Sequence, residues 1–385
     1  MTSRRGHDPS RRARADGADV SRRRDADRPA GLRGRDLPIL QGRGASYNPP
    51  NRFERHYVEP DPEALEADAE APLTELIDDP SRSIIATNDS PDVGFDASVN
   101  PYRGCSHGCV YCYARPTHEY LGYSAGLDFE TKILVKRRAP EMLREALSRP
   151  SWKPRVVAMS GVTDPYQPAE ARLGVTRGCL EVLRDFRNPV AIITKNRLVA
   201  RDADVLADLA SHGAAAVLVS ITSLDRSLQR VLEPRTSTPS GRLETVRRLA
   251  DAGIPVGVMV APVIPGLTDH EAPSIVAAAA EAGALAAHWT MLRLPHGVKE
   301  LFEDWLEAHF PDRRARVLHR IREVRDGRLS DAAFGRRQRG TGEYAGQVAA
   351  LFAAAVRKAG LPGMPPLSAE AFRVPGGARQ LGLFA

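Results

Sequence analysis

The sequence predicts an α/β fold in which βα units close toward a barrel and are followed by helices alone. From about residue 97, short apolar runs alternate with amphipathic helical patterns. The runs are rich in Val and Ile and are apolar nearly throughout, as in strands of a parallel sheet that is buried on both faces. Strand-then-helix order at this spacing is typical of βα units. Beyond Leu294 the pattern is helical only.

The predicted strands and helices of the barrel follow one another in a regular order. The strands are expected at residues 155–159, 190–194, 216–221, 256–260 and 285–292. The helices between them are expected at residues 176–186, 202–212, 242–252 and 272–282. Gly253-Ile254-Pro255 supports one of these boundaries, because Gly ends helices and a new strand follows the Pro. Three further helices are expected at residues 298–309, 313–325 and 343–359.

The two ends of the chain differ in composition from the predicted barrel. Residues 1–45 contain almost no large apolar groups. They cannot bury enough surface to offset their chain entropy, so a disordered Arg-rich tail is expected there. An irregular segment at residues 46–95 leads into the barrel at residues 96–295. A C-terminal helical cap at residues 296–360 and a flexible Pro- and Gly-rich tail at residues 361–385 complete the predicted organisation.

The formal net charge of +6 lies in the N-terminal tail. The chain has 54 Lys and Arg against 48 Asp and Glu, and residues 1–45 hold twelve Arg and six Asp. The rest of the chain has no net charge, which argues against a folded body that binds polyanions non-specifically. No run approaches the ~18 apolar residues of a membrane span. The first residues lack the apolar core of a secretory signal, so a cytoplasmic protein without membrane contact is expected.

Three of the four cysteines lie close together and form the most informative motif of the sequence. Cys105, Cys109 and Cys112 have the spacing C-x3-C-x2-C. Gly104 and Gly108 allow the loop to curl so that the three sulfurs converge on one point. Three thiolates are one fewer than a closed zinc site or a ferredoxin-type cluster requires. A [4Fe–4S] cluster held by three thiolates therefore keeps one iron free for another ligand.

Zinc is the structural alternative for the same loop. His107 could supply a fourth ligand, although its place between two of the cysteines would make the geometry cramped. Cys179, the remaining cysteine, falls in a predicted helix, where a buried and inert thiol is the default. Four cysteines in a chain of this length exclude a disulfide scaffold, and cytoplasmic thiols stay reduced.

With an aromatic residue at Tyr111, the motif resembles the C-x3-C-x-Φ-C signature of the radical S-adenosylmethionine (SAM) enzymes. The resemblance implies a partial (β/α)6 TIM-like barrel with a C-terminal helical extension. It also implies that Cys105, Cys109 and Cys112 hold a [4Fe–4S] cluster whose open iron chelates SAM. A one-electron reductant such as flavodoxin or ferredoxin would drive cleavage of SAM to methionine and a 5′-deoxyadenosyl radical, which abstracts hydrogen from a substrate. Tyr111 would pack near the adenine.

Motifs outside the cysteine loop are similar to those of the branch that includes spore photoproduct lyase and its uncharacterised relatives. They lie at residues 48–53, 113–120, 128–133, 160–170, 193–195 and 261–269. The lyase needs an extra cysteine shortly after its second barrel strand to return a hydrogen atom, and residues 159–170 contain none here. Photoproduct repair is therefore not inferred. Tyr166 is a conceivable radical relay, with a packed aromatic as the simpler interpretation.

Small and hydroxylated residues recur after the predicted strands, at the end where barrels bind their ligands. Ser160 and Gly161 occupy the position where the family's second strand contacts the SAM amino group. The resemblance and the strand order extend the expected cofactor contacts to Thr194, Lys195 and Ser220. Such residues can approach a ribose, an amino group or a carboxylate closely.

Four charged residues near these strand ends are further candidates. Lys132 and Lys195 are two of only six Lys in a chain with 48 Arg. A Lys in this composition indicates a compact point charge for a carboxylate or phosphate, with an ordinary surface Lys as the alternative. Asp164 and Glu170 are either acid/base groups or carboxylates that begin a helix. No catalytic residue is assigned from the sequence.

The residues Gln380–Phe384 resemble the Q-L-x-L-F pentapeptide with which bacterial DNA-processing proteins bind the sliding clamp. A tail after a Pro- and Gly-rich linker is accessible and can deliver Leu383 and Phe384 into a preformed pocket. In the alternative, these apolar residues pack back on the body. Clamp binding would place the protein near DNA, which also fits the Arg-rich N-terminal tail.

Three functions are consistent with the sequence. The first is radical SAM chemistry on nucleic acid or a nucleotide-like substrate, as in DNA repair or modification. The second is radical modification of a small metabolite or peptide, in which the two tails are incidental. The third is a metal-binding module that does not catalyse a reaction.

Overall fold

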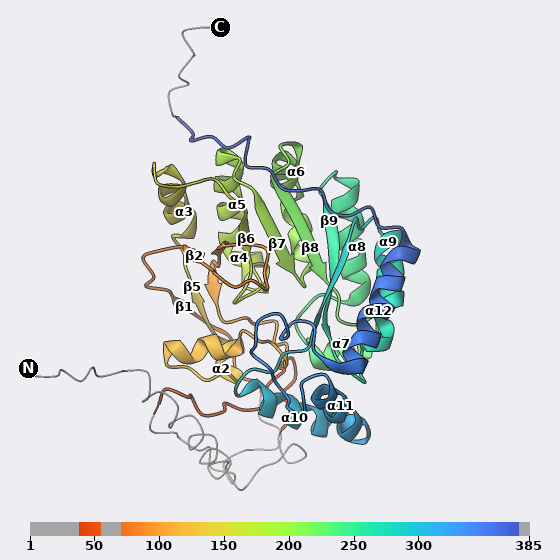
Figure 1. The fold of residues 1–385 in the computed structure, drawn as a ribbon. Helices are drawn as coiled ribbons and strands as arrows, with labels where there is room; N and C mark the ends of the chain where they lie inside the picture. Colours follow the sequence, from red (N-terminus) through yellow and green to blue (C-terminus); the bar gives the residue numbers. More distant parts are fainter. Residues whose placement is uncertain (1–37, 55–70, 377–385) are drawn as a thin grey trace, which may run out of the picture.

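The fold is an open sheet of seven strands, of which six run parallel (Figure 1). The computed structural model describes residues 38–54 and 71–376. The strand order is β10-β9-β8-β7-β6-β3-β2, in which β2 is antiparallel to β3 and the other neighbours are parallel. Within the described residues β10 and β2 are the two edges of this sheet, so the barrel is not closed. The predicted partial barrel is confirmed.

The strands of this sheet are short and apolar. They are β2 Ile85–Thr87, β3 Ala97–Val99, β6 Val157–Met159, β7 Val190–Thr194, β8 Ala215–Ser220, β9 Val256–Val263 and β10 Ala287–Met291. Val217 and Val219 of β8 are fully buried, and Ala216, which points to the opposite face, is also buried. Both faces of the strand therefore lie in the interior, which explains why its sequence does not alternate with polar residues.

Helices on the outside of the sheet connect its parallel strands (Figure 1). They are α3 Ala139–Ser148, α5 Val175–Phe186, α6 Ala203–Ser211, α8 Pro239–Asp251 and α9 Ala272–Glu281. The start of α8 follows from local signals. Pro239 occupies its first position, where a missing N–H costs nothing, and Thr238 Oγ1 accepts a hydrogen bond from Gly241 N at 3.2 Å.

All five predicted strands are present, with ends that differ by up to a few residues. The structure adds elements that the sequence patterns do not reveal. The first barrel strand, β3, has three residues, which is too short for a periodic signal. A second sheet has the order β1-β5-β4. Its strands are β1 Glu75–Asp78, β4 Tyr102–Arg103 and β5 Lys132–Val135, so the segment at 46–95, which contributes β1 and β2, is not irregular throughout.

Three long helices follow the last strand, at the predicted positions. They are α10 Val298–His309, α11 Pro311–Glu323 and α12 Gly342–Ala359. The helices α10 and α11 pack together, and Phe302 and Trp305 of α10 share a hydrophobic cluster with Val110 and Tyr111 of the cysteine loop. In contrast, α12 packs on α9 at the outside of the barrel (Figure 1). The predicted helical cap is thus partly wrong, because α12 extends the outer helix layer.

Residues 361–373, here called the basal strap, are held against the barrel. Ser368 N donates to Gly213 O at 3.0 Å, and Arg373 N donates to Phe186 O at 2.9 Å. These acceptors precede β8 and β7, so the strap crosses the amino ends of the strands (Figure 1). The prediction of a flexible tail from residue 361 is therefore wrong for the strap. Residues 377–385, with the expected clamp motif, lie outside the described residues.

The N-terminal segment joins the fold earlier than predicted. Leu40 and Ala45 are buried, so the Arg-rich tail cannot extend to residue 45. Residues 1–37 lie outside the described residues, and their expected disorder stays a prediction. Among the helices of residues 38–54 and 71–376, none is long and apolar enough to cross a membrane.

Candidate functional site

The three cysteines lie on one loop that follows β3 and β4. Cys105 and Cys109 are buried and Cys112 is partly buried. Gly104 and Gly108, each directly before a cysteine, have φ angles of 77° and 72°. This left-handed conformation is open to Gly without steric cost, so the predicted curling of the loop is present.

The thiols of this loop are close enough to influence one another. Burial, together with the neighbouring Cys105, raises the pKa of Cys112 to about 11. Burial also raises the pKa of Cys109 well above its ordinary value, and Glu233 adds to this rise. Such thiols ionise when a metal centre compensates their charge. The donor set therefore fits a group that brings several positive charges at once, as an iron–sulfur cluster does.

The loop does not have the arrangement of a single-ion site. In the part of the chain that the structure describes, no three His, Cys, Asp or Glu side chains are grouped as ligands of one metal ion. The predicted convergence of the three sulfurs on one point is therefore not observed. In a [4Fe–4S] cluster each thiolate binds its own iron, so the ligands surround a larger group. His107 is also occupied, because its ring nitrogens face Asp164 Oδ2 at 3.4 Å and Asn196 Nδ2 at 3.1 Å.

Arg115 holds the cysteine loop from the interior. Its side chain is fully buried, and Nε and Nη2 donate to Cys109 O at 3.0 and 2.9 Å. Nη1 donates to Gly126 O at 2.9 Å, at the start of α2 (Leu127–Thr131). The charge is balanced by Glu130, whose Oε1 lies 2.5 Å from Nη2. The planar guanidinium thus fixes the loop backbone relative to α2.

Glu130 connects this ion pair to the N-terminal segment. Its Oε1 accepts a hydrogen bond from Ala45 N at 2.8 Å and its Oε2 accepts one from Gly44 N at 3.1 Å. The segment approaches the cysteine loop so closely that a Cβ at Gly44 would lie 1.8 Å from Gly108 O. Sequence patterns do not reveal Gly44, because it is marked only by this tertiary contact.

Gly44→Ala is expected to displace the N-terminal segment from the cysteine loop, because the clashing oxygen belongs to the backbone and cannot rotate away. We expect the free energy of unfolding to fall by about 1–3 kcal/mol. Iron bound after anaerobic reconstitution should fall with it. Denaturant unfolding and iron analysis measure the two effects. Gly346→Ala in α12 is the control, since a Cβ there meets nothing within 4 Å. Unchanged stability and iron content in Gly44→Ala would contradict this packing.

Polar residues after β6 fix the beginning of the loop from the other side. Gln167 Oε1 accepts from Ser106 N at 2.9 Å, and Gln167 Nε2 donates to Gly104 O at 3.1 Å. Thr163 Oγ1 donates to the same carbonyl at 2.7 Å. Gln167 is fully buried, so these bonds form away from competing water. The segment 160–170 therefore supports the cysteine loop directly.

Asp164 links the loop to the end of β7. Its carboxylate accepts hydrogen bonds from Thr194 Oγ1 at 2.7 Å and from Lys195 N at 2.8 Å. Burial opposes the charge of both Asp164 and His107, but their mutual attraction prevails. The pKa of Asp164 is lowered, and Asp164 and Cys105 raise the pKa of His107 to about 9. Asp164 is thus a residue that positions Thr194 and Lys195.

Lys195 makes four polar contacts in the centre of the barrel. Its Nζ donates to Ser220 Oγ at 2.8 Å, to Thr222 Oγ1 at 2.9 Å and to Ala261 O at 2.9 Å. Its charge is paired with Glu233 Oε1 at 3.1 Å. The predicted point charge is therefore present, but the carboxylate that it meets belongs to the protein. These contacts join the ends of β7, β8 and β9.

Glu233 completes this central network and is not indicated by any sequence motif. It is buried, forms an ion pair with Arg242 and accepts hydrogen bonds from Tyr111 Oη and Thr222 Oγ1. Burial opposes ionisation, but Arg242 and Lys195 lower the pKa of Glu233 well below its usual range. Because Tyr111 is bonded to a fixed carboxylate, its ring is held between the cysteine loop and the centre of the barrel.

The open side of the site is formed by Tyr113 and the end of β6. Tyr113 Oη donates to Gly161 O at 2.8 Å, so the cysteine loop contacts a predicted strand-end residue directly. A Cβ at Gly161 would meet nothing within 4 Å, so there is space beside it, and Ser160 is only half-buried. The Arg293 guanidinium lies 5.0 Å from the centroid of the Tyr113 ring. In residues 38–54 and 71–376 no carboxylate forms an ion pair with Arg293.

The remaining candidate residues occupy positions that support the fold. Glu170 is buried, and its carboxylate accepts a hydrogen bond at 2.9 Å from Thr176 N in the first turn of α5. This contact matches the predicted alternative of a carboxylate at the start of a helix. Tyr166 is fully buried in the main hydrophobic core. Lys132 lies near the surface in an ion pair at 3.2 Å. Cys179 is buried in α5, and burial raises the pKa of its thiol.

A family model described as the radical SAM superfamily matches residues 99–279 of the chain. An uncharacterised protein of Mycobacterium tuberculosis is 40% identical over 232 residues, which cover 60% of this chain and 67% of that protein. An uncharacterised protein of Methanocaldococcus jannaschii is 29% identical over 173 residues, which cover 45% of this chain and 62% of that protein.

Solved structures of spore photoproduct lyase have a similar fold. One, of a single-residue variant, matches with a TM-score of 0.54 and 17% identity, over 74% of this chain and 79% of the other. Another, of the lyase complexed with dinucleoside spore photoproduct, matches with a TM-score of 0.52 and 16% identity, over 74% and 79% of the two chains. At this level of identity, the likeness concerns the fold.

Proposed function

The chain belongs to the radical SAM superfamily, and we propose that it is an enzyme that directs the chemistry of this superfamily to nucleic acid or a nucleotide-like substrate. Enzymes of this superfamily use a [4Fe–4S] cluster and SAM. The observation that carries the proposal is the cysteine loop, in which three buried or partly buried thiols are held from two sides by Arg115 and Gln167.

In this proposal Cys105, Cys109 and Cys112 hold the cluster. When bound, the cluster supplies the electron that splits SAM into methionine and a 5′-deoxyadenosyl radical, which takes a hydrogen atom from a substrate. The residues of the chain place the reactants and exclude water. Arg115 and Glu130 fix the loop backbone, and both side chains of this ion pair are fully buried.

We place SAM between the cysteine loop and the ends of the strands. Ser160 and Gly161 leave space for its amino group, and Tyr111 would pack near the adenine. Thr194 and Ser220, at the ends of β7 and β8, would offer hydroxyl groups to the cofactor. The Lys195–Glu233 pair would form a fixed polar surface beneath the cofactor, because all the contacts of Lys195 Nζ described above are made to protein atoms.

Three features support nucleic acid as the substrate class. At the open side, Arg293 lies beside the Tyr113 ring, which is 48% exposed. A cation next to an accessible aromatic ring suits a phosphate and a base. The Arg-rich tail and the Gln380–Phe384 pentapeptide also fit a protein that works near DNA and the sliding clamp. Because residues 159–170 contain no cysteine for hydrogen return, we do not propose photoproduct repair.

Anaerobic reconstitution is expected to give a brown protein with about four irons per chain. Dithionite and SAM should then release 5′-deoxyadenosine. We expect DNA oligonucleotides to raise the rate of release by about tenfold, because binding energy away from the reacting atoms is used to position them. Arg293→Gln should reduce this stimulation, whereas Arg230→Gln, at an exposed position in α7 (Arg226–Leu232), should not. Deuterium carried from labelled DNA into 5′-deoxyadenosine would identify the hydrogen donor.

Other results would favour the alternative functions. A colourless, zinc-loaded protein that does not cleave SAM would indicate a metal-binding module. If DNA does not change the rate of SAM cleavage but a metabolite or peptide does, the protein modifies a small metabolite or peptide instead. Deletion of residues 380–385 tests the clamp separately: the intact chain should bind the clamp, and the shortened chain should not.

A further inference from the structure

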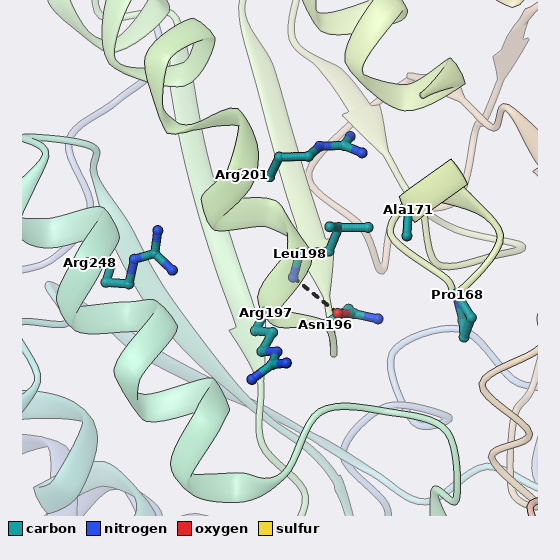
Figure 2. A pocket seen from close by; sticks show the side chains of 7 residues that line it. All are labelled: Pro168, Ala171, Asn196, Arg197, Leu198, Arg201 and Arg248. Atoms are coloured by element: carbon teal, nitrogen blue, oxygen red, sulfur yellow. Dashed lines mark hydrogen bonds between the residues drawn. The ribbon is translucent and has the colours of Figure 1, made fainter. Parts of the chain in front are cut away.

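A cationic surface cavity of about 490 Å³ lies outside the site described above (Figure 2). Arg197, Arg201, Arg248 and Asn196 supply its polar lining, and the rest of the lining is apolar. The cavity lies between α8 and the short helix η4 (Arg197–Asp202), in the helix layer outside the sheet. Asn196 is the second residue after the end of β7, so the cavity adjoins the carboxyl end of this strand.

Two of the three guanidinium groups carry uncompensated charge. Arg201 is engaged by Glu170 at 2.8 Å and by Asp202 at 2.7 Å. Arg197 and Arg248 are exposed, and within the described residues neither side chain has a hydrogen-bond or ion-pair partner. Both extend into the space between η4 and α8 (Figure 2). A local excess of positive charge on a body with no net charge attracts an acidic partner.

Asn196 connects this cavity to the cysteine loop. Its Nδ2 lies 3.1 Å from His107 Nε2. His107 is 1% exposed and lies in the cysteine loop, two residues after Cys105. The side chains of Asn196 and His107 therefore lead from the cavity to the loop that carries the proposed ligands of the cluster.

We propose that this cavity is the docking site of an acidic one-electron carrier protein of the flavodoxin or ferredoxin kind, which delivers the electron for SAM cleavage. This inference rests on the proposed function, because it requires a cluster at Cys105, Cys109 and Cys112. One electron leaves the reduced carrier at the cavity and enters the cluster. The carrier is oxidised by one electron, and no atom or proton is transferred.

The position of the cavity favours a carrier over nucleic acid. In the proposed function a substrate must reach the radical inside the barrel on the side of Tyr113, which is 48% exposed and contacts Gly161 after β6. The cavity lies instead between η4 and α8 in the outer helix layer, and neither Tyr113 nor Gly161 is among its lining residues. An electron needs no open passage to the interior, whereas a reacting base or ribose does.

The test compares two double variants with the same change in charge. Arg197→Glu with Arg248→Glu alters the cavity, and Arg357→Glu with Lys358→Glu alters exposed cations at the end of α12, on the other side of α9. Binding of a bacterial flavodoxin is measured by calorimetry at low and high salt, and SAM cleavage is driven either by reduced flavodoxin or by dithionite. The cavity variant should bind flavodoxin about tenfold more weakly or worse at low salt. Its flavodoxin-driven cleavage should fall in parallel.

Dithionite separates this inference from the proposed function. It is small and needs no docking site, so dithionite-driven cleavage in the cavity variant should equal that of the wild type. If the wild type does not cleave SAM with dithionite, the proposed function fails. If it does, three results would overturn the docking site: flavodoxin affinity unchanged by the cavity variant, equal loss in the α12 variant, or loss of DNA binding with flavodoxin binding intact.

Discussion

Single replacement of Cys105, Cys109 or Cys112 with Ala is expected to reduce release of 5′-deoxyadenosine to background. Each thiolate binds a different iron, so its loss leaves a second iron without a protein ligand and the cluster cannot be retained. The replaced proteins should also be colourless after reconstitution. Iron analysis, the visible absorption spectrum and product release measure these effects together.

Cys179→Ala is the matched control for the three loop cysteines. Cys179 is also fully buried, but it lies in α5 within the main core. Its replacement should cost about 1 kcal/mol of stability through the small cavity that it leaves, while iron content and colour stay at the wild-type level. A Cys109→Ala protein that remains brown and active would show that the loop does not hold the cluster. Loss of iron in Cys179→Ala would show that the loop alone is insufficient.

Glu130→Ala is expected to lower the free energy of unfolding by about 3–5 kcal/mol, because it leaves Arg115 buried without a counterion. It also removes the acceptors for Gly44 N and Ala45 N. The cysteine loop and the N-terminal segment should therefore loosen together. Denaturant unfolding measures the loss, and limited proteolysis after residue 38 should become faster.

Glu75→Ala provides the comparison for Glu130→Ala. Glu75 pairs with Lys132 at 3.2 Å, but its side chain is 62% exposed. A solvated pair of this kind contributes about 0–1 kcal/mol, so the variant should remain close to the wild type in both assays. Equal effects of the two replacements would contradict the central place of the Arg115–Glu130 pair in the loop.

Long periodic elements of the fold were predictable from the sequence, and short ones were not. The strand at 190–194 and the helix at 298–309 have the predicted bounds, because each is an uninterrupted pattern of the right length. By contrast, β3 and β4 have three and two residues. Such strands are stabilised by pairing with partners that are distant in sequence, so their own residues carry no periodic signal.

The same difference between local and long-range features separates the residues of the candidate site. The cysteine spacing is local, so the sequence identifies the loop directly. Gly44 and Glu233 matter only because of what lies opposite them in three dimensions: a backbone oxygen for the first and a Lys, an Arg and a Tyr for the second. Lys195 combines a local and a long-range feature. Its role as a point charge was predictable from the sequence. Its pairing with Glu233 was not, because that contact depends on how β7, β8 and the residues after α7 pack together.

The basal strap also bears on the order of events during synthesis. Arg373 Nε donates to Asp185 O at 3.0 Å across 188 residues of sequence, and the Phe372 and Phe186 rings lie 6.1 Å apart. The ribosome has therefore made every strand of the barrel before the segment that covers their amino ends exists. Because the strap leaves the ribosome after all the strands, this end of the barrel is covered last. Until then the nascent chain exposes apolar surface there, and a chain released early would depend on chaperones for protection.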